Sequence, residues 1–203
     1  MTVNYKFKIK PFDHQITALE RGWQRPEFGL FMEMGTGKSK VLIDNLGMLY
    51  QAGEINFALV IAPKGVYRNW TSKEIPEHMS DDIPHRVIRW VASPNKTQQA
   101  EMRSVGEAFE GLTIFVMNVE SFSSVKGKNA GEWMGRAFGR NGLIAIDEST
   151  TIKNHKAKRT KALMKIASAF KYKRLLTGSP VTKSPMDLYS QCEFLRPGLL
   201  GYD

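Results

Sequence analysis

Two short segments that lie far apart in the chain combine residue types able to bind phosphate groups and metal ions. The first, Gly35-Thr36-Gly37-Lys38-Ser39, follows an apolar run and precedes a helical pattern. Glycines in such a turn let backbone amides close on a phosphate without an intervening side chain, and the first amides of the helix favour an anion. We expect Lys38 to reach the β and γ phosphates of a nucleotide and Ser39 to ligate Mg²⁺.

The turn departs at one position from the strict phosphate-loop pattern, which has a glycine where this chain has Met32. Many helicase-type ATPases keep only the Gly-x-Gly-Lys-Ser/Thr part of that pattern, so nucleotide binding is still predicted. A Gly-Lys-Ser sequence can also form an accidental turn, but its position between a strand and a helix favours the nucleotide. The predicted ATP-binding residues of this turn are Met34, Gly35, Thr36, Gly37, Lys38 and Ser39.

The second segment is an acidic pair, Asp147 and Glu148, which directly follows the apolar run Gly142–Ile146. Carboxylates at the carboxyl end of a buried strand project into the crevice where open α/β sheets bind ligands. Asp147 is expected to hold Mg²⁺ through water, and Glu148 to polarise the attacking water as a general base. An ordinary strand-end turn that caps the next helix is the alternative. The glycine turn upstream favours catalysis, so we predict that both segments meet at one Mg–ATP.

The remaining pattern predicts the elements that hold these segments in place. Short β-rich apolar runs recur at Phe28–Met32, Phe57–Ala62, Arg86–Val91, Thr113–Asn118, Gly142–Asp147 and Arg174–Thr177. Helical patterns lie between them at Asp13–Trp23, Lys38–Gln51, Asn95–Phe109 and Lys156–Phe170. This alternation predicts an α/β fold in which a mainly parallel sheet has helices on both faces. The segment between Ser121 and Asn141 contains four glycines and is predicted to be a loop.

Length and composition fit one domain of ordinary size. The chain has 203 residues, of which 42% are apolar and 24% charged, and its one cysteine, Cys192, cannot form an internal disulfide. Residues Met1–Lys10 lack the apolar core of a signal peptide, and no run approaches the ~20 apolar residues that span a membrane. We expect a reducing, cytoplasmic setting in a bacterium or a phage-infected cell, or the nucleus of a eukaryote, without a membrane partner.

The net charge of +9 is concentrated in one segment. Nine of the 29 basic residues lie between Lys153 and Arg174, while no acidic residue occurs from Ser149 to Met186. The 20 basic residues that remain match the 20 acidic residues of the chain, so the rest of the protein is neutral. A polyanionic partner such as nucleic acid explains a segregated excess, and a solvated helix face is the alternative.

The helix predicted in this basic segment has two contrasting faces. An apolar stripe recurs at helical spacing and consists of Leu163, Ile166, Ala167 and Phe170. The opposite face carries a lysine row made of Lys158, Lys161 and Lys165. We hypothesise that the lysine row, or Lys153 before it, contacts a phosphate backbone in a sequence-independent and salt-sensitive way. The alternative is a solvated face, because exposed lysines are the norm.

Taken in order along the chain, these and further motifs resemble the Swi/Snf-type translocases of helicase superfamily two. The motifs are Pro11-Phe12-x-x-Gln15, Gly35–Ser39, Leu59–Pro63 with Asn69-Trp70, Asp147–Thr150, Ile152-Lys153-Asn154, Arg174–Pro180, Asp187-Leu188-Tyr189 and Phe194–Pro197. Each motif alone is weak, but the ordered set extends from Pro11 to Gly201 and is specific. The resemblance implies a RecA-like lobe with a P-loop NTPase fold, and residues 1–203 are expected to be the first, amino-terminal lobe without the second.

The resemblance also implies roles for individual residues. Gln15 is expected to hydrogen-bond the adenine edge, with Phe12 or Arg21 packed near the base. The residues expected to couple nucleotide state to DNA movement are Thr177, Gly178 and Ser179. Those expected to contact the backbone of one DNA strand are Lys64 beside Pro63, Asn118, Glu120 and Lys153. ATP and Mg²⁺ are the implied cofactors, and DNA is the implied partner, with a duplex favoured over a single strand.

A second RecA-like lobe, in the same chain or in a partner, is implied as well, because superfamily-two motors bind ATP between two lobes. The second lobe supplies arginines that stabilise charge developing on the γ phosphate. No residue after Pro197 could supply them. The chain alone is therefore expected to bind ATP weakly and to hydrolyse it very slowly.

Two positions depart from the family pattern. Thr150 replaces the last residue of the DEAH box, and Thr182-Lys183 stands where many members have Gln-Asn, which bears on coupling rather than on ATP binding. The segment Asn118–Phe122 resembles phage-encoded members more than chromatin remodellers. Three alternatives stay open: a strand-separating helicase of the DEAH or restriction-enzyme type, a non-enzymatic nucleic-acid-binding module, and a P-loop kinase or transport ATPase. The Thr-Gly-Ser-Pro segment argues against the last of these.

Other residues with chemical potential lack the spacing of a site. The histidines show no metal-ligand spacing and are expected at the surface or its boundary: His14, His78, His85 and His155. The tryptophans are expected to pack in the core or at its rim rather than stack on bases: Trp23, Trp70, Trp90 and Trp133. Cys192 is expected to be a small buried apolar side chain.

Overall fold

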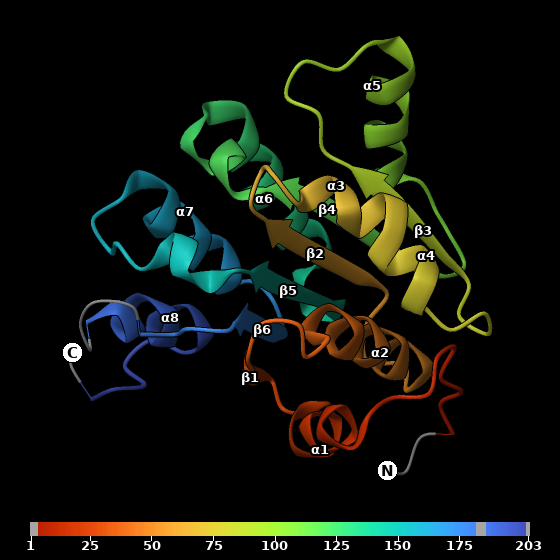
Figure 1. The fold of residues 1–203 in the computed structure, drawn as a ribbon. Helices are drawn as coiled ribbons and strands as arrows, with labels where there is room; N and C mark the ends of the chain where they lie inside the picture. The colour runs from red at the N-terminus through yellow and green to blue at the C-terminus, as the bar shows by residue number, and fades with distance from the viewer. Residues whose placement is uncertain (1–3, 182–185, 202–203) are drawn as a thin grey trace.

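The computed structural model describes residues 4–181 and 186–201, and these residues are built around one sheet (Figure 1). Its strands are β1 (Glu27–Phe31), β2 (Phe57–Ala62), β3 (His85–Arg89), β4 (Leu112–Asn118), β5 (Gly142–Asp147) and β6 (Tyr172–Thr177). They lie in the order β1-β6-β5-β2-β4-β3, and all five pairings are parallel. The predicted α/β fold is confirmed, while the departure expected at Thr182-Lys183 lies outside the described residues.

Helices connect the strands. The α-helices are α1 (Asp13–Gly22), α2 (Lys38–Gln51), α3 (Tyr67–Asn69), α4 (Ile75–His78), α5 (Lys96–Arg103), α6 (Val125–Phe138), α7 (Lys158–Ala167) and α8 (Asp187–Leu195). A π-helical turn, η1 (Trp70–Glu74), joins α3 to α4. Short 3₁₀ turns occur at η2 (Ser104–Gly106), η3 (Val119–Ser123), η4 (Gly139–Asn141) and η5 (Ser149–Ile152).

Strand β2 shows how the sheet is covered on both faces. All six of its side chains are buried. Ala58, Val60 and Ala62 join the core formed with α1, α2, η1 and α4, whereas the alternate residues Phe57 and Ile61 join the core formed with η3, α6, α7 and α8. Since successive side chains of a strand point to opposite faces, helices pack on both sides of the sheet, as Figure 1 shows.

The parallel register brings three strand ends to one edge of the sheet. Phe31 at the end of β1 pairs with Thr177 at the end of β6, and the preceding residue of β6, Leu176, pairs with Asp147 at the end of β5. The backbone N–H of Met32 also donates to the Thr177 carbonyl at 3.2 Å. The segments that follow these three strands therefore start side by side at the carboxyl edge.

The segment predicted to be a loop contains a helix, α6, so that prediction was wrong. Its glycines occur every fourth residue and form a flat stripe on one side of the helix. A Cβ atom at Gly131 would lie 2.8 Å from both Ile166 and Phe122, and one at Gly135 would lie 3.2 Å from Ala169. Here glycine permits close packing of α6 on α7 and η3 rather than a turn.

Other boundaries differ by a few residues. The predicted bounds of α2, β2 and β5 agree with the structure. The helix expected to run to Phe109 ends at Arg103, because the chain tightens into the 3₁₀ turn η2 and then turns extended at Glu107. The segment Tyr67–His78 is helical although no helix was predicted there.

Candidate active site

The turn between β1 and α2 has a backbone that only glycine adopts readily. Gly35 and Gly37 have φ values of +77° and +78°, in the left-handed region. Gly37 also caps the amino terminus of α2, and a Cβ atom there would collide with the Gln15 amide nitrogen. The shape of the turn therefore depends on both torsion and space, and it leaves the first amides of α2 available to an anion.

Lys38 lies inside this turn. Its ammonium group donates to the carbonyl oxygens of Met32 at 3.0 Å and Glu33 at 2.9 Å, and the residue is largely buried. Both acceptors are neutral, so a phosphate oxygen that replaces them gains a stronger, charge-assisted hydrogen bond. Ser39, the next residue of α2, is partly exposed at the same helix terminus.

Residues before β1 brace the turn from outside. Gln15 is buried; its amide group donates to the Thr36 carbonyl at 3.0 Å and accepts from the Phe12 N–H at 3.0 Å. His14 Nε2 lies 2.9 Å from the same Thr36 oxygen, so this nitrogen carries the proton. Phe12 is 69% exposed and stacks on the His14 ring. The role of His14 was missed, and its only signal was its position beside Gln15.

The acidic pair lies at the end of β5. One carboxylate oxygen of Asp147 accepts from the Trp70 indole N–H at 3.0 Å, and the other accepts from the Glu148 backbone N–H at 3.0 Å. Burial raises the pKa of Asp147 above its ordinary value, and the charge of Glu148 adds to this, whereas the Trp70 hydrogen bond and the Lys38 charge oppose it. Asp147 is therefore a carboxylate that a nearby cation stabilises.

Glu148 has an unusual backbone. Its φ of 51° is the one positive value found at a non-glycine residue in the described part of the chain. A left-handed conformation costs a residue with a Cβ atom about 1–2 kcal/mol, and such strain is concentrated at functional sites. The left-handed conformation of Glu148 turns the chain sharply between β5 and the 3₁₀ turn η5, in which Ser149 and Ile152 are buried.

Trp70 is the second residue whose role was missed. It was expected to pack in the core, and it does, with 1% of its surface exposed. Its indole N–H also orients the Asp147 carboxylate from the start of the π-helical turn η1. A π-helical turn inside a helical segment often marks a functional site. The sequence signal for Trp70 was the motif Asn69-Trp70. Without the fold, this motif does not show that Trp70 contacts Asp147.

The structure brings the predicted nucleotide and coupling residues to one edge. The Lys38 ammonium is close enough to lower the pKa of Asp147. A Cβ atom at Gly178 would lie 3.1 Å from Met34 Cγ and 3.2 Å from Met34 N, so the segment after β6 touches the glycine turn. Thr177 Oγ1 accepts from the Ser179 N–H at 3.2 Å within that segment.

The donor set at this edge fits Mg–ATP. The Ser39 hydroxyl and the Asp147 carboxylate are hard oxygen ligands of the kind that Mg²⁺ prefers. The glycine turn supplies amides and an ammonium group, which suit a polyphosphate. The described residues contain no group of three or more His, Cys, Asp or Glu side chains placed to hold a metal ion by themselves. A metal with few protein ligands and phosphate oxygens matches this arrangement.

The residues expected to contact DNA lie near the same edge but differ in how their side chains are used. Lys64, just after β2, is exposed, and its backbone N–H donates to the Glu120 carboxylate at 3.1 Å. Asn118 ends β4, where its side-chain oxygen accepts from the Ser121 N–H at 2.9 Å and thus caps η3. Lys153 follows η5 and is partly exposed.

Part of the basic segment is structural, so not all of its nine basic residues are available to an anion. Arg174 is 1% exposed and donates to the Asn45 side chain and to four backbone carbonyls. Burial lowers its pKa to about 10, so it keeps its charge at neutral pH. Lys173 donates to the Leu195 carbonyl and Lys171 to Glu54. These three cations support the fold.

The lysine row on α7 is exposed, as predicted, but its members are not equivalent. Lys165 pairs with Glu132 on α6 at 3.1 Å, while Lys158 and Lys161 are exposed on the same helix. Its opposite face is buried through Leu163, Ile166 and Ala167. The row can therefore offer two lysines to an anion without breaking an ion pair shown by the structure.

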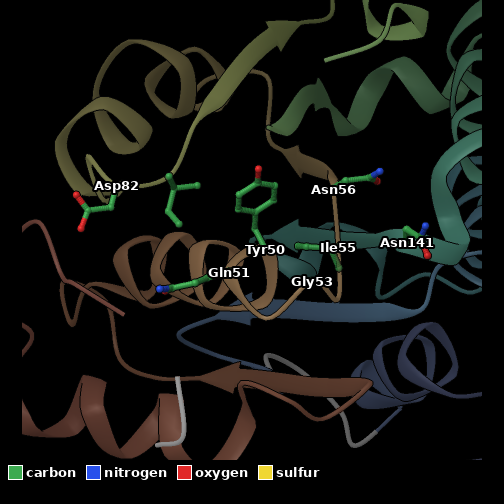
Figure 2. A pocket seen from close by; sticks show the side chains of 8 residues that line it. Tyr50, Gln51, Gly53, Ile55, Asn56, Asp82 and Asn141 are labelled. Atoms are coloured by element: carbon green, nitrogen blue, oxygen red, sulfur yellow. The ribbon is translucent and has the colours of Figure 1, made fainter. Parts of the chain in front are cut away.

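A cavity of about 520 Å³ lies at the other end of the strands (Figure 2). Asn56 and Asn141, which precede β2 and β5, line it together with Tyr50 and Gln51 from the end of α2. None of the predicted site residues lines this cavity. It is therefore separated from the carboxyl edge by the length of the sheet.

Among the described helices, none has the length and apolar character needed to cross a bilayer.

Known proteins are similar in sequence to nearly the whole of this chain. The family model described as the SNF2-related domain matches residues 14–202. The chain is 27% identical to the protein CHROMATIN REMODELING 20 of Arabidopsis thaliana over 98% of the chain. It is 29% identical to an uncharacterized ATP-dependent helicase of Mycoplasma pneumoniae over 89% of the chain. The chain spans 14% and 16% of the lengths of these two relatives.

A solved structure has the same fold. The Sulfolobus solfataricus SWI2/SNF2 ATPase core in complex with dsDNA matches with a TM-score of 0.72 and 24% identity. The match covers 98% of this chain and 38% of that chain. The expected RecA-like architecture is thereby confirmed at the level of the fold. The likeness to phage-encoded members stays a prediction.

Proposed function

Because the chain belongs to the SNF2-related domain family, we propose that it is the ATP-binding lobe of a motor that moves along duplex DNA. The observation that supports this best is the strand register, which brings the glycine turn after β1 and the acidic pair at the end of β5 to one edge of the sheet. The Sulfolobus solfataricus core with the same fold is in complex with dsDNA, which favours a duplex as the partner.

Each residue at this edge has a separate task in the proposed reaction. Lys38 and the amides of the glycine turn bind the β and γ phosphates. Ser39 and Asp147 hold Mg²⁺, which neutralises charge on the phosphates when it is bound. Glu148 accepts a proton from the attacking water. Trp70 fixes the orientation of the Asp147 carboxylate through its hydrogen bond at 3.0 Å.

Two substitutions separate binding from chemistry. Lys38→Ala is expected to lower the affinity for Mg–ATP about 10–100-fold, because a hydrogen bond to a charged group contributes about 1.5–3 kcal/mol. Glu148→Gln is expected to leave that affinity unchanged and to slow single-turnover hydrolysis about 10²–10⁴-fold. Calorimetry and phosphate release with excess protein measure the two effects. The exposed Lys73→Ala is the control, and an equal loss in all three variants contradicts the assignment.

We propose that a second RecA-like lobe, in the same protein or in a partner, completes the site. An arginine from such a lobe is worth about 10³–10⁵ in rate. Residues 1–203 alone are then expected to hydrolyse ATP slowly, with little response to duplex DNA. Brisk DNA-stimulated hydrolysis by residues 1–203 alone refutes this part of the proposal while leaving nucleotide binding intact.

A strand-separating helicase is the second candidate, because the relative from Mycoplasma pneumoniae is named an uncharacterized ATP-dependent helicase. The two candidates share this lobe and differ in the movement that the complete motor makes. A strand-displacement assay with a labelled duplex, paired with displacement of a triplex-forming strand, distinguishes them. Translocation without separation displaces only the third strand.

A further inference from the structure

One buried carboxamide joins the acidic loop, which consists of residues 147–149, to the segment 178–180 after β6. Gln191 lies on α8 and has no exposed surface. Its side-chain oxygen accepts from the Ser149 hydroxyl at 2.5 Å. Its amide nitrogen donates to the Pro180 carbonyl at 2.7 Å and to the Asp187 carbonyl at 2.8 Å.

The two ends of this bridge belong to the two segments that flank the proposed nucleotide site. Ser149 directly follows Glu148 and is fully buried. Pro180 directly follows Gly178-Ser179, the segment that contacts the glycine turn. The acidic loop and the segment 178–180 therefore both bond to the carboxamide of Gln191.

A carboxamide suits the chemistry of the bridge. The side chain accepts a hydrogen bond at one atom and donates at another, and the amide group of Gln191 does both without carrying a charge. The Ser149 side of the bridge is buried and the Pro180 side is partly buried, so a partner lost on the Ser149 side leaves a buried polar atom without compensation. Ser149 stands at the third position of the DEAH-like box, where alanine gives that box its name and has no hydroxyl to donate.

The adjacent residue strengthens the attachment of α8. The Ser190 hydroxyl donates to the Lys153 carbonyl at 3.0 Å, just after η5. Ser190 and Gln191 are consecutive buried residues of α8, and they bond to opposite ends of the turn η5. This turn connects the acidic pair to the next helix. Of these two residues, Gln191 also bonds to the segment after β6.

We propose that Gln191 is a positioning residue that couples the state of the acidic pair to the segment Thr177–Pro180. When Mg–ATP draws Asp147 and Glu148 into place, the shift of Ser149 is carried by Gln191 to the Pro180 carbonyl. This inference rests on the proposed function, because it needs a nucleotide at the carboxyl edge. It adds a side chain outside the recognised motifs to the path between them.

Three variants break the bridge at different points. Ser149→Ala removes only the hydrogen bond to the acidic loop. Gln191→Glu keeps an acceptor for Ser149 but has no donor for the Pro180 carbonyl. Gln191→Met removes the bonds to Ser149 and Pro180, together with the bond to Asp187, at similar volume. Ser190→Ala is the matched control, because it deletes a neighbouring buried hydrogen bond of the same helix and leaves both ends of the bridge in place.

The readout is hydrogen–deuterium exchange at Thr177, Gly178 and Ser179 with and without Mg–ATPγS. We expect the nucleotide to slow this exchange about fivefold or more in the unaltered chain and in Ser190→Ala. The effect should fall to less than about twofold in the three bridge variants, whose nucleotide affinities by calorimetry stay within about threefold of the unaltered chain. Combining Ser149→Ala with Gln191→Met should add no further loss, because both act on one path.

Each other result counts against the proposal. An unchanged response in Gln191→Met, or an equal loss in Ser190→Ala, shows that the bridge does not carry the coupling. Nucleotide binding without any response at Thr177–Ser179 in the unaltered chain overturns the inference alone. Failure of the unaltered chain to bind Mg–ATPγS overturns the proposed function as well. If Gln191→Met unfolds, as thermal melting reports, Ser149→Ala and Gln191→Glu decide the question.

Discussion

The glycine turn and the acidic loop lie at the same edge of the sheet, yet they are held in place by different means. In the glycine turn, Lys38 bonds to carbonyls of Met32 and Glu33, within the same short segment. In the acidic loop, Asp147 is held by Trp70 from the segment after β2, and Ser149 by Gln191 from α8. The glycine turn is thus held mainly by bonds within its own segment, and Gln15 and His14 add support at the Thr36 carbonyl. The acidic loop is held mainly by side chains from distant elements.

This difference predicts different responses to substitution. A local turn fails when its own backbone is changed, because torsion and space are fixed by a few adjacent residues. A loop held from outside fails gradually, because each distant side chain controls one property of the carboxylates. The substitutions below test this contrast in order of decreasing expected effect.

The largest effect is expected for Gly37→Ala. The new Cβ atom must adopt a φ of +78° and collides with the Gln15 amide, so the turn cannot keep its shape. We expect the affinity for Mg–ATP to fall about 100-fold, as about 1–2 kcal/mol of torsional strain is added to the loss of the Gln15 contact. Calorimetry measures this directly.

Gly53→Ala is the matched control for that substitution. Gly53 has a similar φ of +73°, but a Cβ atom there meets nothing within 4 Å. It follows α2 at the far end from the nucleotide. We expect Gly53→Ala to lower thermal stability and to leave nucleotide affinity unchanged. Equal loss of affinity in both variants contradicts a local role for the turn.

A smaller effect, on pH dependence, is expected for Trp70→Phe. Burial raises the pKa of Asp147 and the Trp70 hydrogen bond opposes that rise, so removal of the indole N–H raises the pKa further. Asp147 must be ionised to hold Mg²⁺, so the acid limb of Mg–ATP binding should move to higher pH. Affinity measured across that limb tests this, with Trp133→Phe, at a half-exposed tryptophan, as the control.

The pH dependence of the stability of the nucleotide-free chain should also shift to higher pH in Trp70→Phe. A carboxyl group whose folded pKa lies above its unfolded value stabilises the fold at low pH, and this contribution is lost as pH rises through the folded pKa. In Trp70→Phe the loss should therefore continue to a higher pH than in the unaltered chain. An unshifted acid limb, with stability merely lowered at every pH, leaves Trp70 as a packing residue only.

The same contrast explains what could be predicted from the sequence. The glycine turn, β2 and β5 were predicted correctly because their signals are contiguous runs of residues. Trp70, His14 and Gln191 were missed, because each acts through a contact with a residue at least 22 positions away in the chain. Helix α6 was misread because glycine has two uses, turn formation and close packing, and only the neighbouring helix α7 shows which applies.

The basic segment also contains two kinds of residue, buried cations that support the fold and exposed lysines that can bind an anion. The test of this difference has the smallest expected effect. Arg174 and Lys173 are inside and cannot meet DNA, whereas Lys158 and Lys161 are exposed on α7. Each lysine that contacts a duplex phosphate contributes about 0.9 to the slope of log affinity against log salt. Replacing Lys158 and Lys161 with Ala should lower that slope by up to about two and weaken binding at low salt.

Lys165→Ala and Lys171→Ala are the controls for the lysine row, since these lysines already pair with Glu132 and Glu54. Fluorescence anisotropy with a labelled duplex across a salt series should show little change for either. If Lys158→Ala with Lys161→Ala leaves the slope unaltered, the row is a solvated helix face. DNA contact then falls to the loops at Lys64 and Lys153, which follow β2 and η5 at the carboxyl edge.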